Sequence, residues 1–341
     1  MNSAAPSPPD RPRLLILHGG DLPPGRERID GHPGLGEVVY TTADELAARL
    51  PGTHFLFVWD LFSEALAAAW PAADVLTRVH AATAGVDNLM FPALVESGVV
   101  VTNSRGIFEQ PIAEYVLGLV IAHAKDFHRT GEHQRERRWE HRETRRVAGS
   151  RALIVGTGPI ARATARLLTA VGVRVRASGS RARTGDPDFG DVVLSSTAEH
   201  GPQGEPTLFG ELPAADHVIV AAPLTDTTRG LVDRTFLNLM KPTAQLVNVA
   251  RGPIVVQSDL VAALDLGAIA GAALDVFEHE PLDSANPLWG LPGSVVSPHM
   301  AGDVAGWREE LVDLFLDELS RYLDGREPRN AVDKRRGYVP G

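Results

Sequence analysis

The 341-residue sequence contains no cysteine. This absence excludes disulfides, thiolate catalysis and cysteine-based metal sites, and no other metal site is predicted. The sequence also lacks an excess of positive charge, because 33 Lys and Arg residues stand against 43 Asp and Glu residues and the formal net charge is -10. Nucleic acid is bound mainly through cationic contacts to phosphate, so this balance argues against a nucleic-acid partner.

Long apolar runs are absent as well. No run in the sequence approaches the roughly 18 residues that a membrane-spanning helix needs. The first residues, MNSAAPSPPDRPR, contain no apolar segment of the kind found in signal peptides. We therefore expect a cytoplasmic protein with no membrane partner. The length of the chain and its 44% of hydrophobic residues indicate two domains, each with its own core.

Predicted strands and helices alternate along most of the chain. Apolar strands are predicted at 13–20, 54–60, 74–83, 98–104, 152–156, 173–177, 217–222, 245–250, 270–276 and 294–298, and long helices at 110–126 and 305–325. The stretch 185–213 is rich in Gly, Pro, Asp and Ser and is predicted to be an irregular connection with one short strand at 191–196. Such alternation is typical of parallel sheets covered on both faces, so we predict an α/β fold with doubly wound sheets.

An arginine-rich stretch, RERRWEHRETRR at 135–146, has two interpretations. It could be a basic patch for a polyanion, or a solvated helix and loop. Glu136, Glu140 and Glu143 interrupt the arginines. This mixing of charges favours the solvated helix and loop.

The segment RALIVGTGPIARATARLL places a small-residue turn between a strand and a helix. Gly156, Gly158 and Ala161 follow the order G-x-G-x-x-A. In a dinucleotide-binding fold the first glycine permits a tight turn, the second admits the pyrophosphate, and the third small residue lets helix and strand pack closely. The N-terminus of the helix, with Pro159 in its first turn, would offer N–H groups and a positive dipole to phosphate. A purely structural turn is the alternative, and the strand–turn–helix context favours the dinucleotide site.

Polar side chains follow three later strands. Arg251 and His299 each come directly after an apolar strand, and Glu280 lies shortly beyond Asp275, which ends another. Taken singly, Arg251 is more simply a surface residue and His299 a structural one. Because ligands bind beyond the carboxyl ends of parallel strands, the three strand ends together indicate one crevice. There Arg251 could bind a carboxylate and His299, beside a carboxylate, could transfer a proton.

These motifs in this order resemble the D-isomer-specific 2-hydroxyacid dehydrogenase family. The resemblance rests on GTGPIA, APLTDTTRGL, VNVARG, ALDVFEHEPL and SPHMAG, and in the first half on TAGVDN and VTNSRGIFEQPIAEYVLGL. It extends over nearly the whole chain. It implies two Rossmann-like domains: a flavodoxin-like substrate-binding domain made of 1–106 and 300–341, and an NAD(P)-binding Rossmann domain at 107–299.

The resemblance also implies roles for individual residues. Arg251 would hold the substrate carboxylate and polarise the keto oxygen, His299 would give or take the proton, and Glu280 would hydrogen-bond His299 and keep it protonated for reduction. The backbone N–H groups of Ala84 and Gly85 would grip the substrate carboxylate. The family further implies a homodimer, with the helix at 110–125 and the region of Trp139 in the contact.

For the cofactor, the resemblance and the glycine motif together predict an extended set of contacts, with Asp275 at the nicotinamide carboxamide. The predicted cofactor-binding residues are Gly156, Thr157, Gly158, Pro159, Ile160, Gly179, Ser180, Arg181, Arg183, Pro223, Thr228, Val249, Ala250, Arg251, Asp275 and His299.

The end of the strand at 173–177 bears on which nicotinamide cofactor is used. The acid that binds the ribose hydroxyls in NAD-dependent members corresponds to Gly179 in this sequence. A glycine neither accepts hydrogen bonds from those hydroxyls nor repels a 2′-phosphate. Ser180 can donate a hydrogen bond to phosphate, and Arg181 and Arg183 are cations close in sequence. We therefore predict that NADP(H) is preferred and that NAD(H) use is possible.

The function predicted from all of this is hydride transfer between NAD(P)H and a small 2-oxo acid or D-2-hydroxy acid, chiefly as a glyoxylate/hydroxypyruvate-type reductase. Two alternatives exist on the same fold: an NAD-binding, corepressor-like regulator, and a phosphonate- or formate-type dehydrogenase. Trp59, Phe108 and Tyr115 could line the substrate pocket, although plain packing is the simpler interpretation of each.

Overall fold

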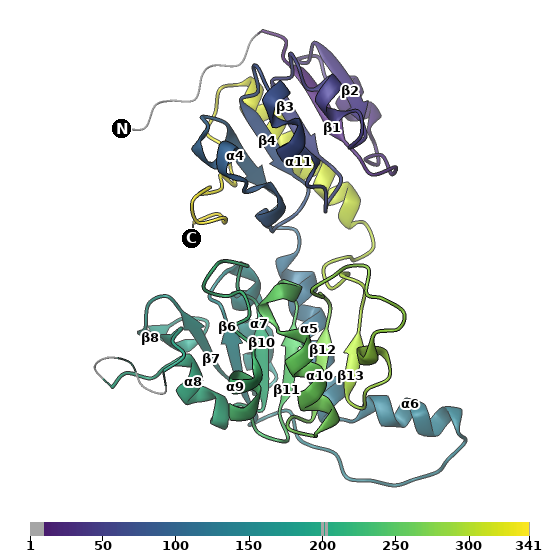
Figure 1. The fold of residues 1–341 in the computed structure, drawn as a ribbon, viewed down its shortest axis with the longest axis vertical. Helices are drawn as coiled ribbons and strands as arrows, with labels where there is room; N and C mark the ends of the chain where they lie inside the picture. The colour runs from purple at the N-terminus through teal and green to yellow at the C-terminus, as the bar shows by residue number, and fades with distance from the viewer. Residues whose placement is uncertain (1–9, 199–200, 202–203, 341) are drawn as a thin grey trace. The chain divides into compact units, whose positions relative to one another are not determined.

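The computed structural model describes residues 10–198, 201 and 204–340 (Figure 1). The chain forms two compact units. The first joins residues up to Phe108 with those from Val304 onward, and the second is Glu109–Asp303. The chain thus leaves the first unit and returns to it.

The first unit contains a five-stranded parallel sheet in the order β2-β1-β3-β4-β5 (Figure 1). Its strands are β1 (Arg13–Leu17), β2 (Glu37–Thr41), β3 (Phe55–Val58), β4 (Arg78–Ala81) and β5 (Val100–Asn103). The order 2-1-3-4-5 is that of flavodoxin-like folds. Edge strand β2 is partly exposed and was not predicted from the sequence.

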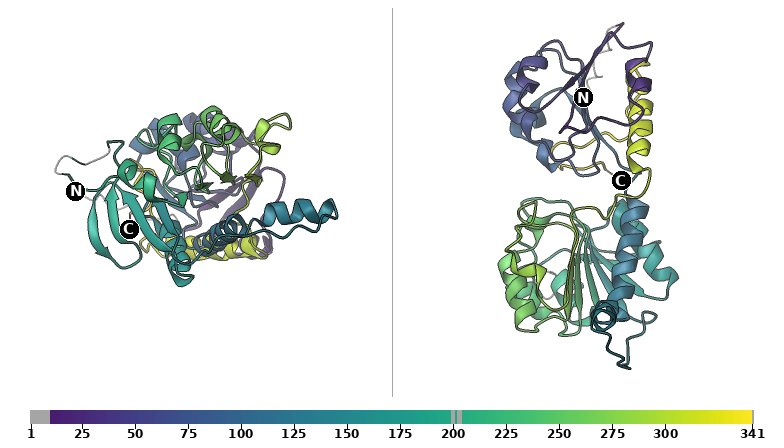
Figure 2. Two further views of the ribbon diagram at one scale, coloured as in Figure 1. Left: turned by 90° about the horizontal axis from the view of Figure 1, so that it is seen from below. Right: turned by 90° about the vertical axis from the view of Figure 1, so that its right-hand side faces the viewer.

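Helices cover both faces of this sheet, as the right-hand view of Figure 2 shows. Those of the first unit are α1 (Glu27–Asp30), α2 (Leu46–Arg49), α3 (Ala65–Ala69), α4 (Pro92–Glu96) and α11 (Trp307–Leu323). Alternate residues of each strand serve the two faces: Leu15 packs with the residues of α2, α3 and α4, while Phe57 stacks on Phe315 of α11 at 3.9 Å between ring centroids.

The second unit contains an eight-stranded sheet in the order β13-β12-β11-β10-β6-β7-β9-β8. Its strands are β6 (Arg151–Val155), β7 (Arg174–Gly179), β8 (Arg183–Asp186), β9 (Gly190–Leu194), β10 (His217–Val220), β11 (Gln245–Asn248), β12 (Gly271–Leu274) and β13 (Ser294–Val296). All neighbours pair in parallel except β8, which runs antiparallel to β9. Read from β9 to β12, this is the Rossmann order, extended by one strand at each end. The predicted α/β fold with doubly wound parallel sheets is confirmed.

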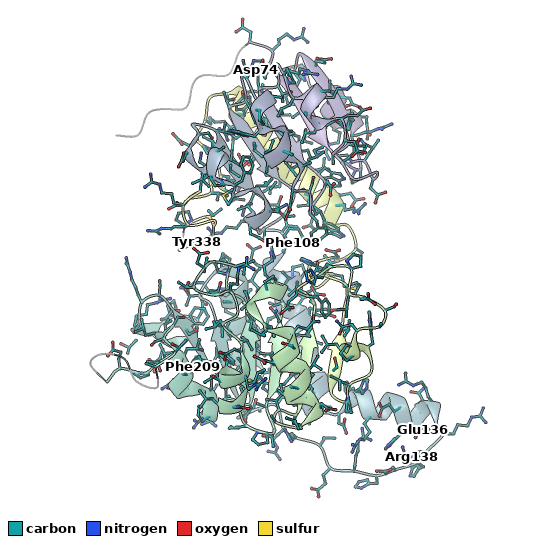
Figure 3. The ribbon with its side chains drawn as sticks, viewed as in Figure 1. Asp74, Phe108, Glu136, Arg138, Phe209 and Tyr338 are labelled. Carbon is teal, nitrogen blue, oxygen red and sulfur yellow. The ribbon has the colours of Figure 1, made fainter. Side chains whose placement is uncertain are left out.

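Two apolar clusters cover the faces of the second sheet. Helices α5 (Glu109–Ala124) and α7 (Pro159–Ala170) pack on one face, where Ile154 points. Helices α8 (Leu208–Glu211), α9 (Arg234–Leu239) and α10 (Gln257–Asp265) pack on the other, where Leu153 points and Phe209 is buried (Figure 3). Helix α6 (Phe127–Arg135) and the segment after it extend away from this sheet (Figure 1).

The stretch 185–213 is more regular than the sequence indicated. Its described part contains the end of β8, β9 and α8, where one short strand was expected. None of the helices in the described residues has the length and apolar character that crossing a bilayer takes.

Candidate active site

The predicted cofactor and catalytic residues of the second unit follow the carboxyl ends of its strands. Strands β6, β10, β11, β12 and β13 are parallel, so their carboxyl ends lie together at one end of the sheet. Strand order reverses between β6 and β10, which is where a doubly wound sheet forms its ligand crevice.

Gly156 makes the tight turn after β6 and must be glycine. Its φ is +118°, a region that side chains rarely allow. A Cβ here would lie 2.6 Å from the carbonyl oxygen of Ala221. Ala161, the third residue of α7, is fully buried against the sheet. The protein's own packing therefore explains both positions.

Gly158 is different, because the protein's packing does not require it to be glycine. Its φ of -72° suits any residue, and a Cβ would meet no atom of a neighbouring described residue within 4 Å. The residue is the N-cap of α7, and Pro159 opens the helix behind it. Open space in front of a helix N-terminus, reached through a residue without a side chain, fits the close approach of a pyrophosphate.

Gly179 is the last residue of β7, and the space around it is tight. A Cβ would lie 3.1 Å from Cγ2 of Thr157 and 3.3 Å from Cγ1 of Val192. A carboxylate side chain at this position would require those neighbours to move. The position predicted for a ribose-binding acid thus has no acid and is also crowded.

The nearest downstream acid, Asp186, is occupied by the protein itself. The Arg162 guanidinium donates to both its oxygens, at 3.0 and 3.1 Å, and Arg183 Nε donates at 2.9 Å. Burial raises the pKa of Asp186, but the hydrogen bonds from Arg162, the Asp188 backbone and Arg183 outweigh it and hold that pKa well below its usual range. Asp186 is therefore a charged structural anchor.

The three predicted phosphate-binding side chains are all exposed, and two of them differ in their partners. Arg183 is tied to Asp186. Among the residues that the structure describes, no carboxylate pairs with Arg181. Ser180 precedes it and comes directly after β7. From the sequence the two arginines are equivalent candidates for binding phosphate. In the structure they differ, because Arg183 is bound to Asp186.

The loop ends of β10 and β11 hold four more predicted cofactor contacts. Thr228 Oγ1 donates to the carbonyl of Pro223 at 2.7 Å, which closes the loop after β10. Val249 and Ala250 follow β11 and are nearly buried. The side chain of buried Asn248 fixes this turn, because it accepts from the Ala250 N–H at 3.1 Å and donates to the carbonyl of Arg251. Asn248 was not predicted from the sequence to have a role.

Arg251 stands where the loops after β11 and β12 meet. Its Nη1 donates to the carbonyl of Ala250 at 2.8 Å. The next residue, Gly252, packs so closely that a Cβ would lie 1.9 Å from the backbone of Phe277. Only glycine allows this contact, which brings the Arg251 turn against the loop that leads to Glu280.

His299 and Glu280 form a hydrogen-bonded pair. The distance from His299 Nδ1 to Glu280 Oε2 is 2.8 Å, and the other carboxylate oxygen accepts from the Phe277 N–H at 2.9 Å. Burial raises the pKa of Glu280, but the hydrogen bonds from His299 and Phe277 and the positive charges of His299 and Arg251 hold that pKa below its usual value. Glu280 is therefore a carboxylate at neutral pH. Both side chains keep partial access to solvent.

Asp275 fixes the loop that carries His299. Its carboxylate accepts from Ser297 Oγ at 2.7 Å and from the N–H groups of Met300 and Ala301, both at 2.9 Å. The backbone of His299 has a φ of +53°, which is costly for a residue with a side chain and persists only where surrounding bonds impose it. The predicted contact of Asp275 with the nicotinamide carboxamide remains a prediction.

Ala84 and Gly85 lie in the first unit, in the loop after β4. The Ala84 carbonyl accepts from the side chain of Asn103, and Thr83 Oγ1 donates to the carbonyl of Gly85 at 2.6 Å. The hydrogen bond from Asn103, the last residue of β5, thus fixes this loop. Asn103 was not predicted from the sequence to have a role in the site.

The three candidate pocket residues have packing partners in their own units. Trp59 is 5% exposed and contacts Phe57, and Phe108, labelled in Figure 3, packs near Trp307 at 6.0 Å between ring centroids. Tyr115 packs against the cluster under α5 and α7.

The model of the D-isomer specific 2-hydroxyacid dehydrogenase family, NAD binding domain, matches residues 117–301. A glyoxylate reductase from Thermofilum pendens is 33% identical over 270 residues, which cover 77% of this chain and 76% of that protein.

Two solved structures show the same likeness over almost the whole chain. A D-isomer specific 2-hydroxyacid dehydrogenase from Xanthobacter autotrophicus Py2, in complex with NADPH and MES, has a TM-score of 0.75 and 32% identity, covering 96% of this chain and 100% of that one. An NADPH-dependent glyoxylate/hydroxypyruvate reductase from Sinorhizobium meliloti, in complex with NADP and malonate, has a TM-score of 0.76 and 27% identity, covering 97% and 99%.

Proposed function

This chain belongs to the D-isomer specific 2-hydroxyacid dehydrogenase family, and we propose from that premise that it is an NAD(P)-dependent reductase of small 2-oxo acids. Glyoxylate and glyoxylate/hydroxypyruvate reductases are among its relatives. We assign substrate binding to residues 1–106 and 300–341, and cofactor binding to residues 107–299.

The hydrogen bond between His299 Nδ1 and Glu280 Oε2 carries this proposal. Reduction of a ketone requires a hydride at carbon and a proton at oxygen, and the bound nicotinamide supplies the hydride. Because a carboxylate can only accept a hydrogen bond, the Glu280 carboxylate holds Nδ1 of His299 as the donor and fixes the orientation of the ring. Since Glu280 engages Nδ1, Nε2 of His299 would give its proton to the keto oxygen.

Arg251 would bind the substrate carboxylate through its planar guanidinium and polarise the keto oxygen. Its contact with the Ala250 carbonyl and the close packing of Gly252 support a fixed position for this side chain. The backbone N–H groups of Ala84 and Gly85 would bind the same carboxylate.

NADP(H) is the cofactor we propose this chain prefers. A 2′-phosphate would meet no acid at Gly179, and the Asp186 carboxylate is already neutralised by two guanidiniums. Arg181 would supply the main charge-assisted contact, with Ser180 as a further donor. The Xanthobacter and Sinorhizobium structures, which contain NADPH and NADP, support this choice. NAD(H) use at lower efficiency is compatible with the same site.

The two alternative functions are less well supported. A corepressor-like regulator would need the cofactor but no proton donor, so the hydrogen-bonded pair of Glu280 and His299 would have no function in it. For a formate- or phosphonate-type oxidation the relatives named above offer no parallel: two are reductases of glyoxylate or of glyoxylate/hydroxypyruvate, and the third is a 2-hydroxyacid dehydrogenase. We also propose a homodimer and a cytoplasmic location.

Steady-state assay of the purified protein with NADPH against a panel of small 2-oxo acids tests the proposal. His299→Asn should fold and bind NADPH like the parent while kcat falls by roughly 10²-fold or more, because general acid catalysis contributes on that scale. Exposed His141→Asn is the matched control and should retain full activity. A parent protein inert toward every 2-oxo acid, or a His299→Asn variant with parental kcat, would contradict the proposal.

A further inference from the structure

The last part of the chain, residues 327–340, is held against the sheet of the first unit; we name it the C-terminal strap. It runs beside edge strand β5, where Ala331 forms an antiparallel bridge with Thr102. The Val332 N–H donates to the carbonyl of Val101 at 2.9 Å, and the Val332 side chain is nearly buried in the core of the unit. The strap therefore adds a short paired segment to the edge of the sheet.

Two charged side chains fix the strap further along. The Lys334 ammonium donates to the carbonyls of Leu94, in the last turn of α4, and of Ser97 and Val99, just after that helix, at 2.9, 2.7 and 2.9 Å. Arg105 Nη1 donates to the carbonyl of Pro340 at 3.1 Å, close along the chain to Tyr338, which Figure 3 labels. The strap is thus anchored at two further points beyond its β-bridge with β5.

Asn330 connects the strap to the end of β5. Its Nδ2 donates to the carbonyl of Arg105 at 2.8 Å and to that of Asn103 at 3.2 Å. Its own carbonyl accepts from the Asn103 N–H at 3.3 Å. Asn330 therefore bonds both the N–H and the carbonyl of Asn103.

Asn103 in turn fixes the loop after β4. It is 3% exposed, and its Nδ2 donates to the carbonyl of Ala84 at 2.5 Å. That carbonyl belongs to the same planar trans peptide as the Gly85 N–H, and the two groups point in opposite directions. Pinning the carbonyl on the β5 side therefore aims the Gly85 N–H away from it.

We propose that the C-terminal strap sets the direction of the Gly85 N–H, through Asn330 and Asn103, and thereby tunes affinity for the 2-oxo acid. Asn330 and Asn103 are positioning residues that do not themselves contact substrate. The inference rests on the proposed function, in which the Ala84 and Gly85 N–H groups bind the substrate carboxylate. The other explanation of the strap is that it only covers an exposed sheet edge.

Kinetics of Asn330→Ala and of the isosteric Asn330→Asp, which lacks the Nδ2 donor, separate the two explanations. We expect KM for the 2-oxo acid to rise about five- to tenfold, the scale of one lost hydrogen bond, with kcat and KM for NADPH nearly unchanged. Arg336→Ala breaks an ion pair with Asp333 in the same strap and should leave all three constants at parental values. An unchanged KM for the 2-oxo acid in both Asn330 variants would overturn the proposal. So would a joint loss of kcat, NADPH affinity and thermal stability, which edge covering alone predicts.

Amide hydrogen exchange at Gly85 in the substrate-free protein gives a second readout that does not depend on activity. We expect exchange at Gly85 to change in both Asn330 variants and to stay as in the parent in Arg336→Ala. If the parent protein reduces no 2-oxo acid, the proposed function fails while this measurement still decides the strap: a parental signal at Gly85 in both Asn330 variants would refute it.

Discussion

At the residue scale, the candidate site depends on small differences between similar side chains. Arg181 and Arg183 stand two positions apart, yet within the described part of the chain only Arg183 is tied to a carboxylate, that of buried Asp186. Gly156 and Gly158 are likewise two positions apart, and only the first is required by the protein's own backbone. Such differences arise from neighbours distant in sequence, and they decide which residue has capacity left for a ligand.

The two arginines of the cofactor loop should therefore differ on substitution. Arg181→Ala should lower kcat/KM for NADPH by about tenfold, near 1.4 kcal/mol, with little effect on NADH, because it removes the cation available to a 2′-phosphate. Arg183→Ala should affect NADPH less and should lower thermal stability, since it strips a partner from the Asp186 carboxylate. Assays with both cofactors and one 2-oxo acid check this. Equal use of NADPH and NADH by the parent protein, or a stronger cofactor effect at Arg183, would speak against it.

At the element scale, the turn between β6 and α7 combines a structural demand with a functional one. The turn must be tight, because the backbone after β10 passes directly beside Gly156. The helix must begin at Pro159 so that its N-terminus faces the open space next to Gly158. The strand–turn–helix arrangement thus sets both the fold of the unit and the place where phosphate can bind.

Substitution of the two glycines should separate these demands. Gly156→Ala should reduce the melting temperature or prevent folding, because both its positive φ and the nearby Ala221 carbonyl oppose a Cβ. Gly158→Ala should melt like the parent while KM for NADPH rises about tenfold or more, because the methyl group takes space that the pyrophosphate needs. Thermal melts and steady-state kinetics check the pair. A destabilised Gly158→Ala protein with parental NADPH affinity would reverse the assignment.

At the scale of the whole molecule, each unit buries histidines that stay neutral. In the first unit, burial lowers the pKa of His80 to about 3, helped by the charge of Arg78. In the second, burial lowers the pKa of His217 to about 4, helped by His123. Because both side chains lie deep in their sheets, protonation of either requires the unit around it to open.

Acid should therefore destabilise both units well before their carboxylates titrate. An unfolded histidine takes up a proton near pH 6.5 while the buried one does not, so the unfolded state gains protons as pH falls. The contribution of the two histidines to the free energy of unfolding is fully present above pH 6.5. It should fall by about 1.4 kcal/mol per pH unit for each histidine as the pH drops toward 4. Calorimetric melts from pH 8 to 4.5 measure this. His217→Gln should flatten the dependence, and exposed His141→Gln should not.

The assembly is the second question at this scale. Trp139 is 99% exposed in the segment after α6, which extends from the second unit near the labelled Glu136 and Arg138 (Figure 3). Such exposure of a tryptophan is costly unless another surface covers it. If a second copy covers it, Trp139→Ser should shift the mass in solution from dimer to monomer at low micromolar concentration. Light scattering measures that mass, and a parent protein that is monomeric throughout would refute the homodimer.

Local patterns allowed much of this protein to be predicted from its sequence. Alternating apolar strands and helices predict a doubly wound α/β fold, because both faces of a parallel sheet must be covered by helices to be buried. The G-x-G-x-x-A turn and the polar residues at successive strand ends indicated where a site would form, because parallel strands end at one edge. Strand β9 was predicted as the short strand at 191–196, whereas β2 and β8 were missed. Strand β2 is a half-exposed edge strand, and β8 borders a stretch rich in Gly, Pro and Asp.

The sequence by itself determined the fold class, the family and the kinds of chemistry that the strand ends can perform. Only the tertiary structure decided which side chains are already committed: Arg183 to Asp186, Asp275 to the His299 loop, and Asn330 to Asn103, 227 positions away. The physical reason is that a hydrogen bond depends on distance and direction between two groups, and neither is encoded locally when the partners are far apart in the chain.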